Sequence, residues 1–188
     1  MSARLNDLVV ISGFSGAGKS SAMNVFDDAG YFCVDNLPPG MIRSLAGLFL
    51  HEGSKVERAC VVSDLRAGDY FARLAAVLDE LDGDGVANRV LFLQADEQTL
   101  LTRYKETRRR HPLARNGNVA DGVRREQELL APIRERADCI IDTTGLSPVV
   151  SMTVSARSRI GASSACSRWI PSATLPLRAC GWRRRVSL

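Results

Sequence analysis

A glycine-rich stretch near the start of this 188-residue chain constrains its fold more than any other feature. An apolar, β-branched run over 8–12 precedes it, and helical spacing over 19–28 follows it. The stretch has the spacing G-x-x-x-x-G-K-S and consists of Gly13, Phe14, Ser15, Gly16, Ala17, Gly18, Lys19 and Ser20. A buried strand, this spacing and then a helix form the context of a Walker A phosphate-binding loop.

Each residue type in this motif has a separate role in binding a nucleoside triphosphate. Gly13, Gly16 and Gly18 let the backbone turn its N–H groups toward phosphate oxygens, and the following helix adds its positive end. We expect Lys19 to neutralise the β- and γ-phosphates and Ser20 to offer its hydroxyl to Mg²⁺. The motif therefore predicts a site for a nucleoside triphosphate together with Mg²⁺.

Strand-like and helical segments alternate along residues 1–145. The patterns predict further strands over 31–34, 59–63, 89–93 and 139–141, helices over 40–51, 68–81, 96–108 and 119–137, and a turn over 82–85. This alternation indicates an α/β fold, a P-loop NTPase of the kinase-like type with a parallel sheet flanked by helices. We expect 1–145 to form one nucleotide-binding domain.

Residues 146–188 have a different composition, rich in Ser and Arg. Seven of the 25 basic residues and none of the 21 acidic ones follow Asp142, so residues 1–142 carry a net charge of −3 although the whole chain carries +4. The basic excess therefore belongs to the tail and does not make the domain a nucleic-acid binder. The tail has no apolar periodicity, and we expect it to be disordered or translated out of frame.

Two aspartates follow predicted buried strands. Asp64 comes after the strand over 59–63, and Asp35 comes after the strand over 31–34. A carboxylate at the end of a strand beside the loop can hold the Mg²⁺ shell, which we assign to Asp64, and we assign a substrate or catalytic-water role to Asp35. Each aspartate can instead cap the next helix, and this alternative stays open.

A basic segment from Arg103 to Pro112 ends the helix predicted over 96–108. Cations at a helix C-terminus match its dipole, which is one explanation of the charge. The functional alternative is a mobile lid whose arginines, with Arg108 as the catalytic candidate, stabilise a transferring phosphoryl group. Arg103 and Arg108 are five residues apart and so do not share one helix face.

The remaining composition points to a cytoplasmic protein with no membrane partner. No run reaches the roughly 18 apolar residues of a membrane span, and the start lacks an apolar signal segment. The five cysteines form no C-x-x-C pair, and we expect Cys33, Cys60 and Cys139 to be buried free thiols.

Four motifs in this order resemble the RapZ (also YvcJ) family of nucleotide-binding RNase adapter proteins. They are Gly-x-Ser-Gly-x-Gly-Lys-Ser at 13–20, Gly-Tyr-Phe-Cys-Val-Asp-Asn-Leu-Pro at 30–38, Asp-x-Arg at 64–66, and Arg-Tyr-x-x-Thr-Arg-Arg-x-His-Pro-Leu at 103–113. The resemblance implies ATPase and GTPase activity. It places the ATP motif on 13–20 and a GTP-type motif on Asp64, Leu65, Arg66 and Ala67.

The resemblance also implies an RNA or RNase partner, held mainly by a C-terminal domain that we do not find in this sequence. We therefore expect a protein that binds and slowly hydrolyses ATP and GTP, with a homo-oligomer left open. The alternative is a small-molecule kinase, for which Asp35 and Arg43 are the only acceptor-site candidates. RNA binding through the tail arginines is a weaker third class, because only Trp169 and Trp182 are interleaved with them.

Overall fold

The computed structural model describes residues 5–64, 73–108, 111–114 and 118–145, which fold around a five-stranded sheet. Its strands are β1 (Asp7–Gly13), β2 (Phe32–Val34), β3 (Arg58–Val62), β4 (Asn88–Gln94) and β5 (Cys139–Asp142). All four pairings are parallel, and the order across the sheet is β2-β3-β1-β4-β5. The predicted parallel α/β architecture is confirmed.

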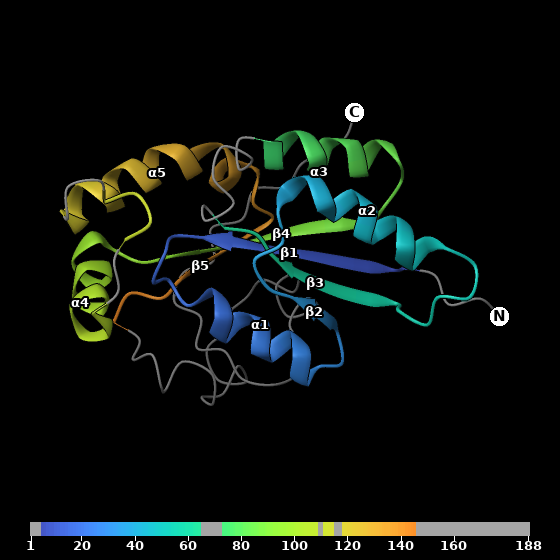
Figure 1. Cartoon of the computed structure of the whole chain (residues 1–188), viewed down its shortest axis with the longest axis horizontal. Coiled ribbons are helices and arrows are strands. Elements are labelled where there is room, and N and C mark those ends of the chain that lie inside the picture. The colour runs from blue at the N-terminus through green and yellow to red at the C-terminus, as the bar shows by residue number, and fades with distance from the viewer. Residues whose placement is uncertain (1–4, 65–72, 109–110, 115–117, 146–188) are drawn as a thin grey trace, which may run out of the picture.

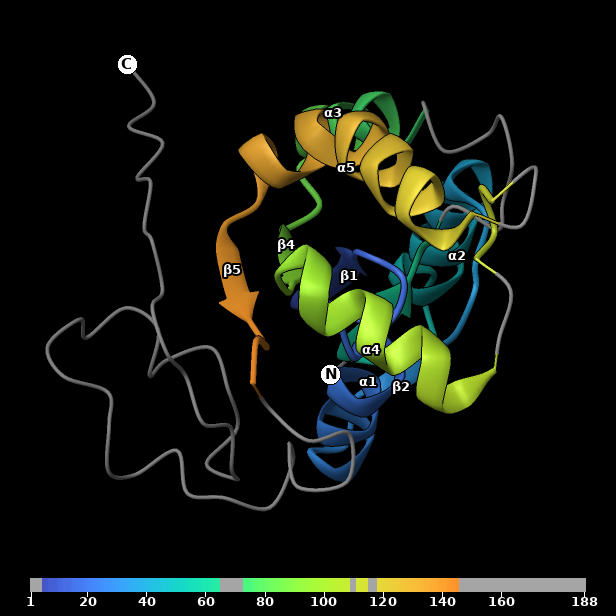
Figure 2. The same ribbon diagram turned by 90° about the vertical axis from the view of Figure 1, so that its left-hand side faces the viewer.

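The described residues form five α-helices around this sheet: α1 (Lys19–Asp28), α2 (Pro39–Leu50), α3 (Leu74–Gly83), α4 (Glu97–Thr107) and α5 (Val119–Arg136). Helix α1 lies on one face, whereas α2, α3 and α5 lie on the other (Figure 1). Helix α4 stands at the edge where the strands end (Figure 2). Both faces are thus covered, which explains why the central strands are apolar runs without alternation. No helix among the described residues is long and apolar enough to span a bilayer.

Most element bounds differ from the predicted ones by no more than one residue. Asp96 accepts a hydrogen bond from the Thr99 N–H at 2.6 Å and so caps α4 from outside the helix. The larger error concerns α3, which continues through Gly83, two residues beyond its predicted end. Its turn comes later because Gly85 is the residue with positive φ (71°). Residues 68–72 of that predicted helix lie outside the described residues.

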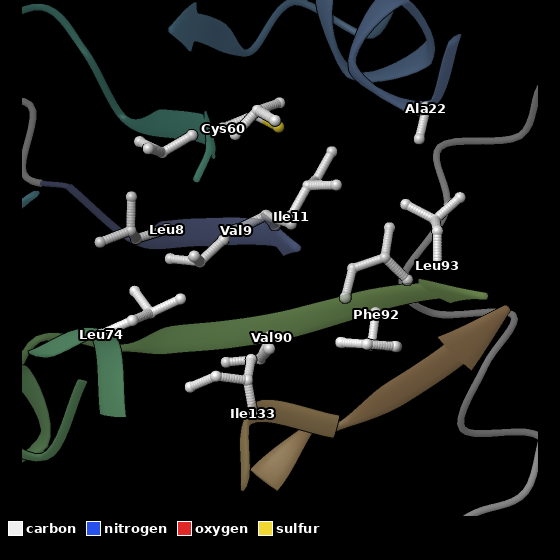
Figure 3. Close-up of a cluster of buried hydrophobic side chains, with 14 of the residues drawn as sticks. Leu8, Val9, Ile11, Ala22, Cys60, Leu74, Val90, Phe92, Leu93 and Ile133 are labelled. Atoms are coloured by element: carbon white, nitrogen blue, oxygen red, sulfur yellow. The ribbon is translucent and has the colours of Figure 1, made fainter. Parts of the chain in front are cut away.

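The core lies between the sheet and its helices (Figure 3). Val9 and Ile11 of β1 and Phe92 of β4 are completely buried, and Ile133 of α5 packs against the same cluster. Burying one such side chain stabilises the fold by roughly 1.5 to 3 kcal/mol. β1 is therefore held at the centre of the molecule, and the segment that follows it starts from a rigid support.

The cysteine prediction is confirmed for two positions and wrong for one. Cys60 and Cys139 are buried free thiols, whereas Cys33 on the edge strand β2 is half-buried. Burial is the main cause that raises the pKa of both the Cys33 and the Cys60 thiol. These thiols stay protonated and are poor nucleophiles at neutral pH.

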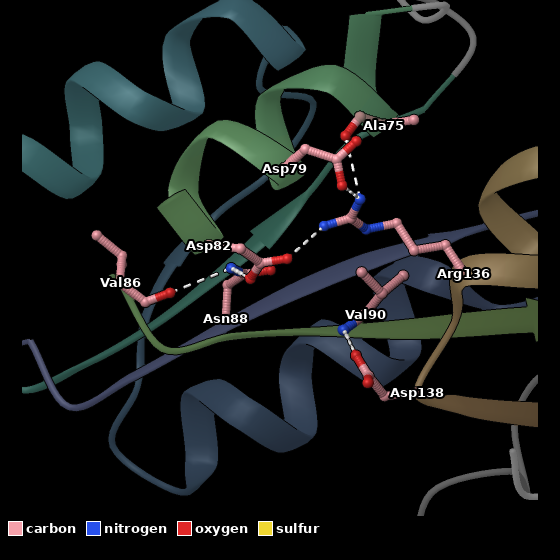
Figure 4. A network of polar contacts seen from close by, with 8 residues as sticks. All are labelled: Ala75, Asp79, Asp82, Val86, Asn88, Val90, Arg136 and Asp138. Carbon is pink, nitrogen blue, oxygen red and sulfur yellow. Dashed lines mark hydrogen bonds and ion pairs between the residues drawn. The ribbon is translucent and has the colours of Figure 1, made fainter. Parts of the chain in front are cut away.

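The carboxyl end of α5 is tied to α3 by Arg136 (Figure 4). Its guanidinium donates to Asp82 Oδ2 at 2.7 Å, to the Ala75 carbonyl at 3.3 Å, and to Asp79. One residue beyond the helix cap, Asp138 accepts from the Val90 N–H at 2.8 Å. These contacts fix where α5 crosses the sheet.

Candidate functional site

The loop over residues 13–20, here called the glycine loop, connects the central strand β1 to α1. Gly13 has φ 143°, and a Cβ built on it would lie 2.1 Å from the Leu93 carbonyl oxygen of β4. No other residue fits that space, because the obstacle is the backbone of the neighbouring strand. Gly18, with φ 99°, is the N-cap of α1, and no side chain caps this helix. Glycine therefore lets the chain turn from the strand into the helix.

Lys19 is the first residue of α1, and its side chain folds back over the glycine loop. Its Nζ donates to the carbonyls of Gly13 at 2.8 Å and of Phe14 at 3.3 Å, and the residue is 9% exposed. Ser20 follows it and is exposed. Since the first N–H groups of a helix have no acceptor within it, this end of α1 combines an ammonium group, outward N–H groups and the positive end of the helix dipole.

Asp64 and Asp35 both lie at the edge where the glycine loop begins. β3 pairs directly with β1, and the Ser63 N–H donates to the Ile11 carbonyl at 3.0 Å, so the half-buried Asp64 follows at the level of the loop. Asp35 is exposed and lies one strand further out, where the Leu37 N–H donates to the Val62 carbonyl at 2.9 Å. Leu65, Arg66 and Ala67, the rest of the expected GTP-type motif, lie outside the described residues.

Arg103 of α4 contacts the glycine loop from outside. Its guanidinium donates to the Gly16 carbonyl at 2.8 Å, and to the carbonyl and hydroxyl oxygens of Thr143 at 2.7 and 3.0 Å. Thr143 follows β5, and its hydroxyl also donates to the Ala17 carbonyl at 3.1 Å. Burial lowers the pKa of Arg103, and the acidic side chains near it oppose that shift. Arg103 thus connects the glycine loop to the residue that follows β5.

Arg108 has entirely different surroundings, as the five-residue spacing predicts. It is the C-cap of α4, has φ 50° in the left-handed region, and is exposed. Arg109 and Arg110, which continue the expected lid, lie outside the described residues.

A buried polar network that the sequence patterns did not predict lies behind the glycine loop. Glu126 of α5 is 1% exposed and accepts two bonds from Ser15, one from its backbone N–H at 2.9 Å and one from its hydroxyl at 2.7 Å. His111 is 3% exposed, and its Nε2 lies 3.2 Å from Glu126 Oε2. The segment after α4 is thereby connected to the loop through α5.

The hydrogen bonds indicate which ring nitrogen of His111 is the donor. The Leu113 N–H donates to His111 Nδ1 at 3.1 Å, so Nδ1 carries no proton and Nε2–H donates to Glu126. Three groups then donate to the side-chain oxygens of Glu126: the Ser15 N–H, the Ser15 hydroxyl and the His111 ring.

One signal in the sequence could have revealed Glu126. The buried residues Val123, Leu130 and Ile133 form one apolar stripe along α5, and Glu126 occupies the position between the first two. A charged residue inside an apolar stripe at helical spacing indicates a buried partner. No local pattern names that partner, because Ser15 is 111 residues away.

Arg43, considered above as an acceptor-site residue, does not contribute to this edge. Its guanidinium donates to Asp84 at 2.8 and 3.2 Å and reaches Glu80 at 3.5 Å, which ties α2 to the end of α3. Asp84 precedes β4, so this contact lies at the opposite edge of the sheet, where the strands start. The Arg43 assignment is wrong.

The described residues contain no group of three or more His, Cys, Asp or Glu side chains placed to hold a metal ion. Ser20 and Asp64 are oxygen donors at the ends of neighbouring elements, and Mg²⁺ prefers oxygen ligands and keeps several waters. A Mg²⁺ ion that also binds phosphate oxygens needs no more than such a pair, so these residues fit it.

A parallel sheet of order β2-β3-β1-β4-β5, with the glycine loop between its central strand and α1, defines a P-loop fold of the kinase-like type. Among solved structures, the chain is similar to shikimate kinase from Acinetobacter baumannii in complex with shikimate, with a TM-score of 0.48, 17% identity, and coverage of 78% of this chain and 87% of that one. The chain belongs to the family of the RapZ-like N-terminal domain, whose model matches residues 6–162.

Two curated relatives illustrate the family match. The chain is 50% identical over 147 residues to a "Nucleotide-binding protein" of Rubrobacter xylanophilus, covering 77% of this chain and 48% of the relative. It is 49% identical over 142 residues to a "Nucleotide-binding protein" of Lactiplantibacillus plantarum, covering 75% and 48%. The chain spans about half the length of these relatives. The predicted family is thus confirmed.

Proposed function

We propose that the glycine loop binds the phosphates of ATP or GTP together with Mg²⁺, and that the protein hydrolyses the bound nucleotide slowly. The observation that carries the proposal is the position of Lys19. Its ammonium group lies over the loop on two carbonyls, at the uncapped start of α1. The names of the relatives, which describe nucleotide-binding proteins, agree with it.

In this proposal, the Lys19 ammonium binds phosphate oxygens when the nucleotide is bound. The carbonyls of Gly13 and Phe14 are among the groups that accept from the Nζ, and phosphate oxygens, which carry full negative charge, form shorter and stronger bonds to an ammonium than neutral carbonyls do. The N–H groups at the start of α1 and the turns at Gly16 and Gly18 supply further donors. These donors can hold a triphosphate without binding its base, which agrees with activity toward both ATP and GTP.

The residues around the loop have distinct roles in hydrolysis. Ser20 and Asp64 would hold Mg²⁺, which supplies charge neutralisation on the β- and γ-oxygens. Arg108 would add positive charge to the transferring phosphoryl group, and Asp35 would orient the attacking water. Turnover is slow in this proposal because both side chains are exposed in the described structure and are not held in place by a buried contact.

A small-molecule kinase is the second candidate, and one observation favours it. The bond from Leu37 to Val62 brings the turn that carries Asp35 beside the strand that precedes Asp64. An acceptor hydroxyl bound there would compete with water for the same phosphoryl group. An RNA or RNase partner is a separate expectation from the family resemblance.

Calorimetry and a hydrolysis assay on the full chain test the proposal. Wild type should bind Mg·ATP and Mg·GTP and release phosphate slowly, with no product that depends on a panel of small hydroxylated acceptors. Asp64→Asn should weaken Mg²⁺-dependent binding and hydrolysis together, with partial recovery at high Mg²⁺. Acceptor-dependent product would establish the kinase instead, and a lack of nucleotide binding would refute both.

A further inference from the structure

The glycine loop is held from two sides by side chains of different helices. On one side Arg103 and Thr143 bind the carbonyls of Gly16 and Ala17. On the other side the Glu126 carboxylate binds both the N–H and the hydroxyl of Ser15. Three consecutive residues of the loop therefore have a polar group fixed by a partner outside the loop.

We propose that Glu126 is the positioning residue of the glycine loop, acting through Ser15, and that His111 orients Glu126. This inference rests on the proposed nucleotide site. Glu126 touches no phosphate, because its carboxylate is buried and its acceptor positions are taken by Ser15 and His111. Glu126 fixes the conformation of the loop backbone before the ligand binds, so that less of the binding free energy is spent on ordering the loop.

The contacts of His111 fix the orientation of its ring relative to Glu126. Its ring lies 5.0 Å from that of Tyr104, centre to centre, and a Cβ on Gly122 would come within 2.6 Å of its Nδ1. The imidazole is thus held between α4 and α5, with its Nε2–H aimed at Glu126. The His-Pro-Leu segment at 111–113 is connected in this way to Ser15, and through it to the start of the phosphate cradle.

The Glu126→Gln variant tests whether Glu126 acts through its hydrogen bonds or through its negative charge. The glutamine amide oxygen can accept from the Ser15 N–H and from His111, as Oε2 does, and its NH₂ group can donate to the Ser15 hydroxyl in place of Oε1. Alanine removes every one of these contacts. If geometry is what matters, Glu126→Gln recovers most of what Glu126→Ala loses, and the removal of a negative charge near the phosphates favours binding further.

The experiment compares Glu126→Ala, Glu126→Gln and Leu130→Ala in the full chain. Leu130 is one turn further along the same helix, is 1% exposed, and belongs to the apolar core, so it is the matched control for loss of stability. Three quantities are measured for each variant. They are the hydrogen exchange rate of the Ser15 amide without nucleotide, the Kd for Mg·ATP by calorimetry, and the free energy of unfolding in urea.

We expect Glu126→Ala to speed Ser15 amide exchange and to raise the Kd for Mg·ATP, each by about tenfold or more. Glu126→Gln should return both to within about threefold of wild type, and Leu130→Ala should keep the Kd within about twofold despite its lower stability. His111→Leu should weaken binding less than Glu126→Ala and add little to it in the double variant. If Glu126→Ala does not fold, Glu126→Asp replaces it, because a carboxylate one methylene shorter cannot keep both bonds to Ser15.

The inference is overturned if wild type binds Mg·ATP and Glu126→Ala binds it equally well, or if Leu130→Ala loses as much affinity. It also fails if Ser15 exchange is unchanged in Glu126→Ala. Should wild type bind neither nucleotide, the proposed function fails, and Ser15 exchange still decides whether Glu126 positions the loop.

Discussion

Two of the charged side chains of α5 that bind neighbouring elements differ in their surroundings: Glu126 lies in the middle of the helix and Arg136 at its end. Glu126 is almost completely buried, and so are its partners Ser15 and His111. The Arg136 side chain is 10% exposed, but its partners Asp79 and Asp82 are 68% and 56% exposed. If Arg136 is removed, water can solvate the exposed Asp79 and Asp82, whereas water has little access to Ser15 and His111 if Glu126 is removed. Loss of the Glu126 bonds at the loop edge should therefore lower the free energy of unfolding more than loss of the Arg136 bonds at the opposite edge of the sheet.

The largest effect on stability is expected at the base of the glycine loop. Gly13→Ala would place a methyl group 2.1 Å from the Leu93 carbonyl oxygen, at a φ of 143°. Backbone strain and overpacking add, so unfolding should become easier by about 3 kcal/mol or more. Urea denaturation measures this. A variant of wild-type stability would contradict the described contact between the loop and β4.

Alanine substitutions at two helical glycines test how stability responds beside the buried network and at an open surface. Gly122→Ala should destabilise the protein by about 2 kcal/mol, because the new methyl group meets His111 Nδ1 at 2.6 Å. Gly47→Ala on α2 has nothing within 4 Å and should stabilise it by about 0.5 to 1 kcal/mol through helix propensity. Equal effects in urea denaturation would mean that His111 does not pack against α5.

Two arginines test the same contrast with a smaller expected effect. Arg103→Ala removes the guanidinium that binds the Gly16 and Thr143 carbonyls. It should lower the free energy of unfolding by about 1 to 2 kcal/mol and also weaken nucleotide binding. The Arg43 side chain is 54% exposed, and Arg43→Ala should cost less than about 0.5 kcal/mol and leave affinity unchanged. Unfolding and calorimetry on both variants decide whether burial sets the difference.

The smallest expected effect concerns acid stability at the end of β5. Burial alone would raise the pKa of Asp142, but hydrogen bonds from Thr144 and Gln94 and the charge of Arg103 outweigh it and lower the pKa. Because the folded pKa lies below the unfolded value of about 3.9, the stabilisation is present above that pH and is lost as pH falls through the folded pKa. Asp142→Asn should therefore flatten the decline in stability below about pH 4, measured by urea denaturation at several pH values. If the stability of Asp142→Asn fell below pH 4 as steeply as that of wild type, Asp142 would not contribute to the acid dependence of stability.

Local patterns predicted the strands, the helices and the positions of Asp35 and Asp64 at the loop edge. They succeeded because buried parallel strands are continuous apolar runs and because the motif at 13–20 lies between a predicted strand and a predicted helix, as its structural context requires. The role of Arg103 was not predicted, since neither a dipole-matched helix end nor a lid includes a bond to the Gly16 carbonyl. Such contacts depend on how distant segments pack, and periodicity carries no information about that.

If the glycine loop binds triphosphate through Lys19, the Lys19→Ala variant should have a higher Kd for Mg·ATP than wild type. Calorimetry on the full chain should show a loss of about tenfold or more, the size expected when a charge-assisted contact is removed. Arg43→Ala, which removes a cation at the opposite edge, is the matched control and should keep the wild-type Kd. If wild type binds Mg·ATP and Lys19→Ala binds it with the same Kd, the nucleotide does not use this loop and the account is contradicted.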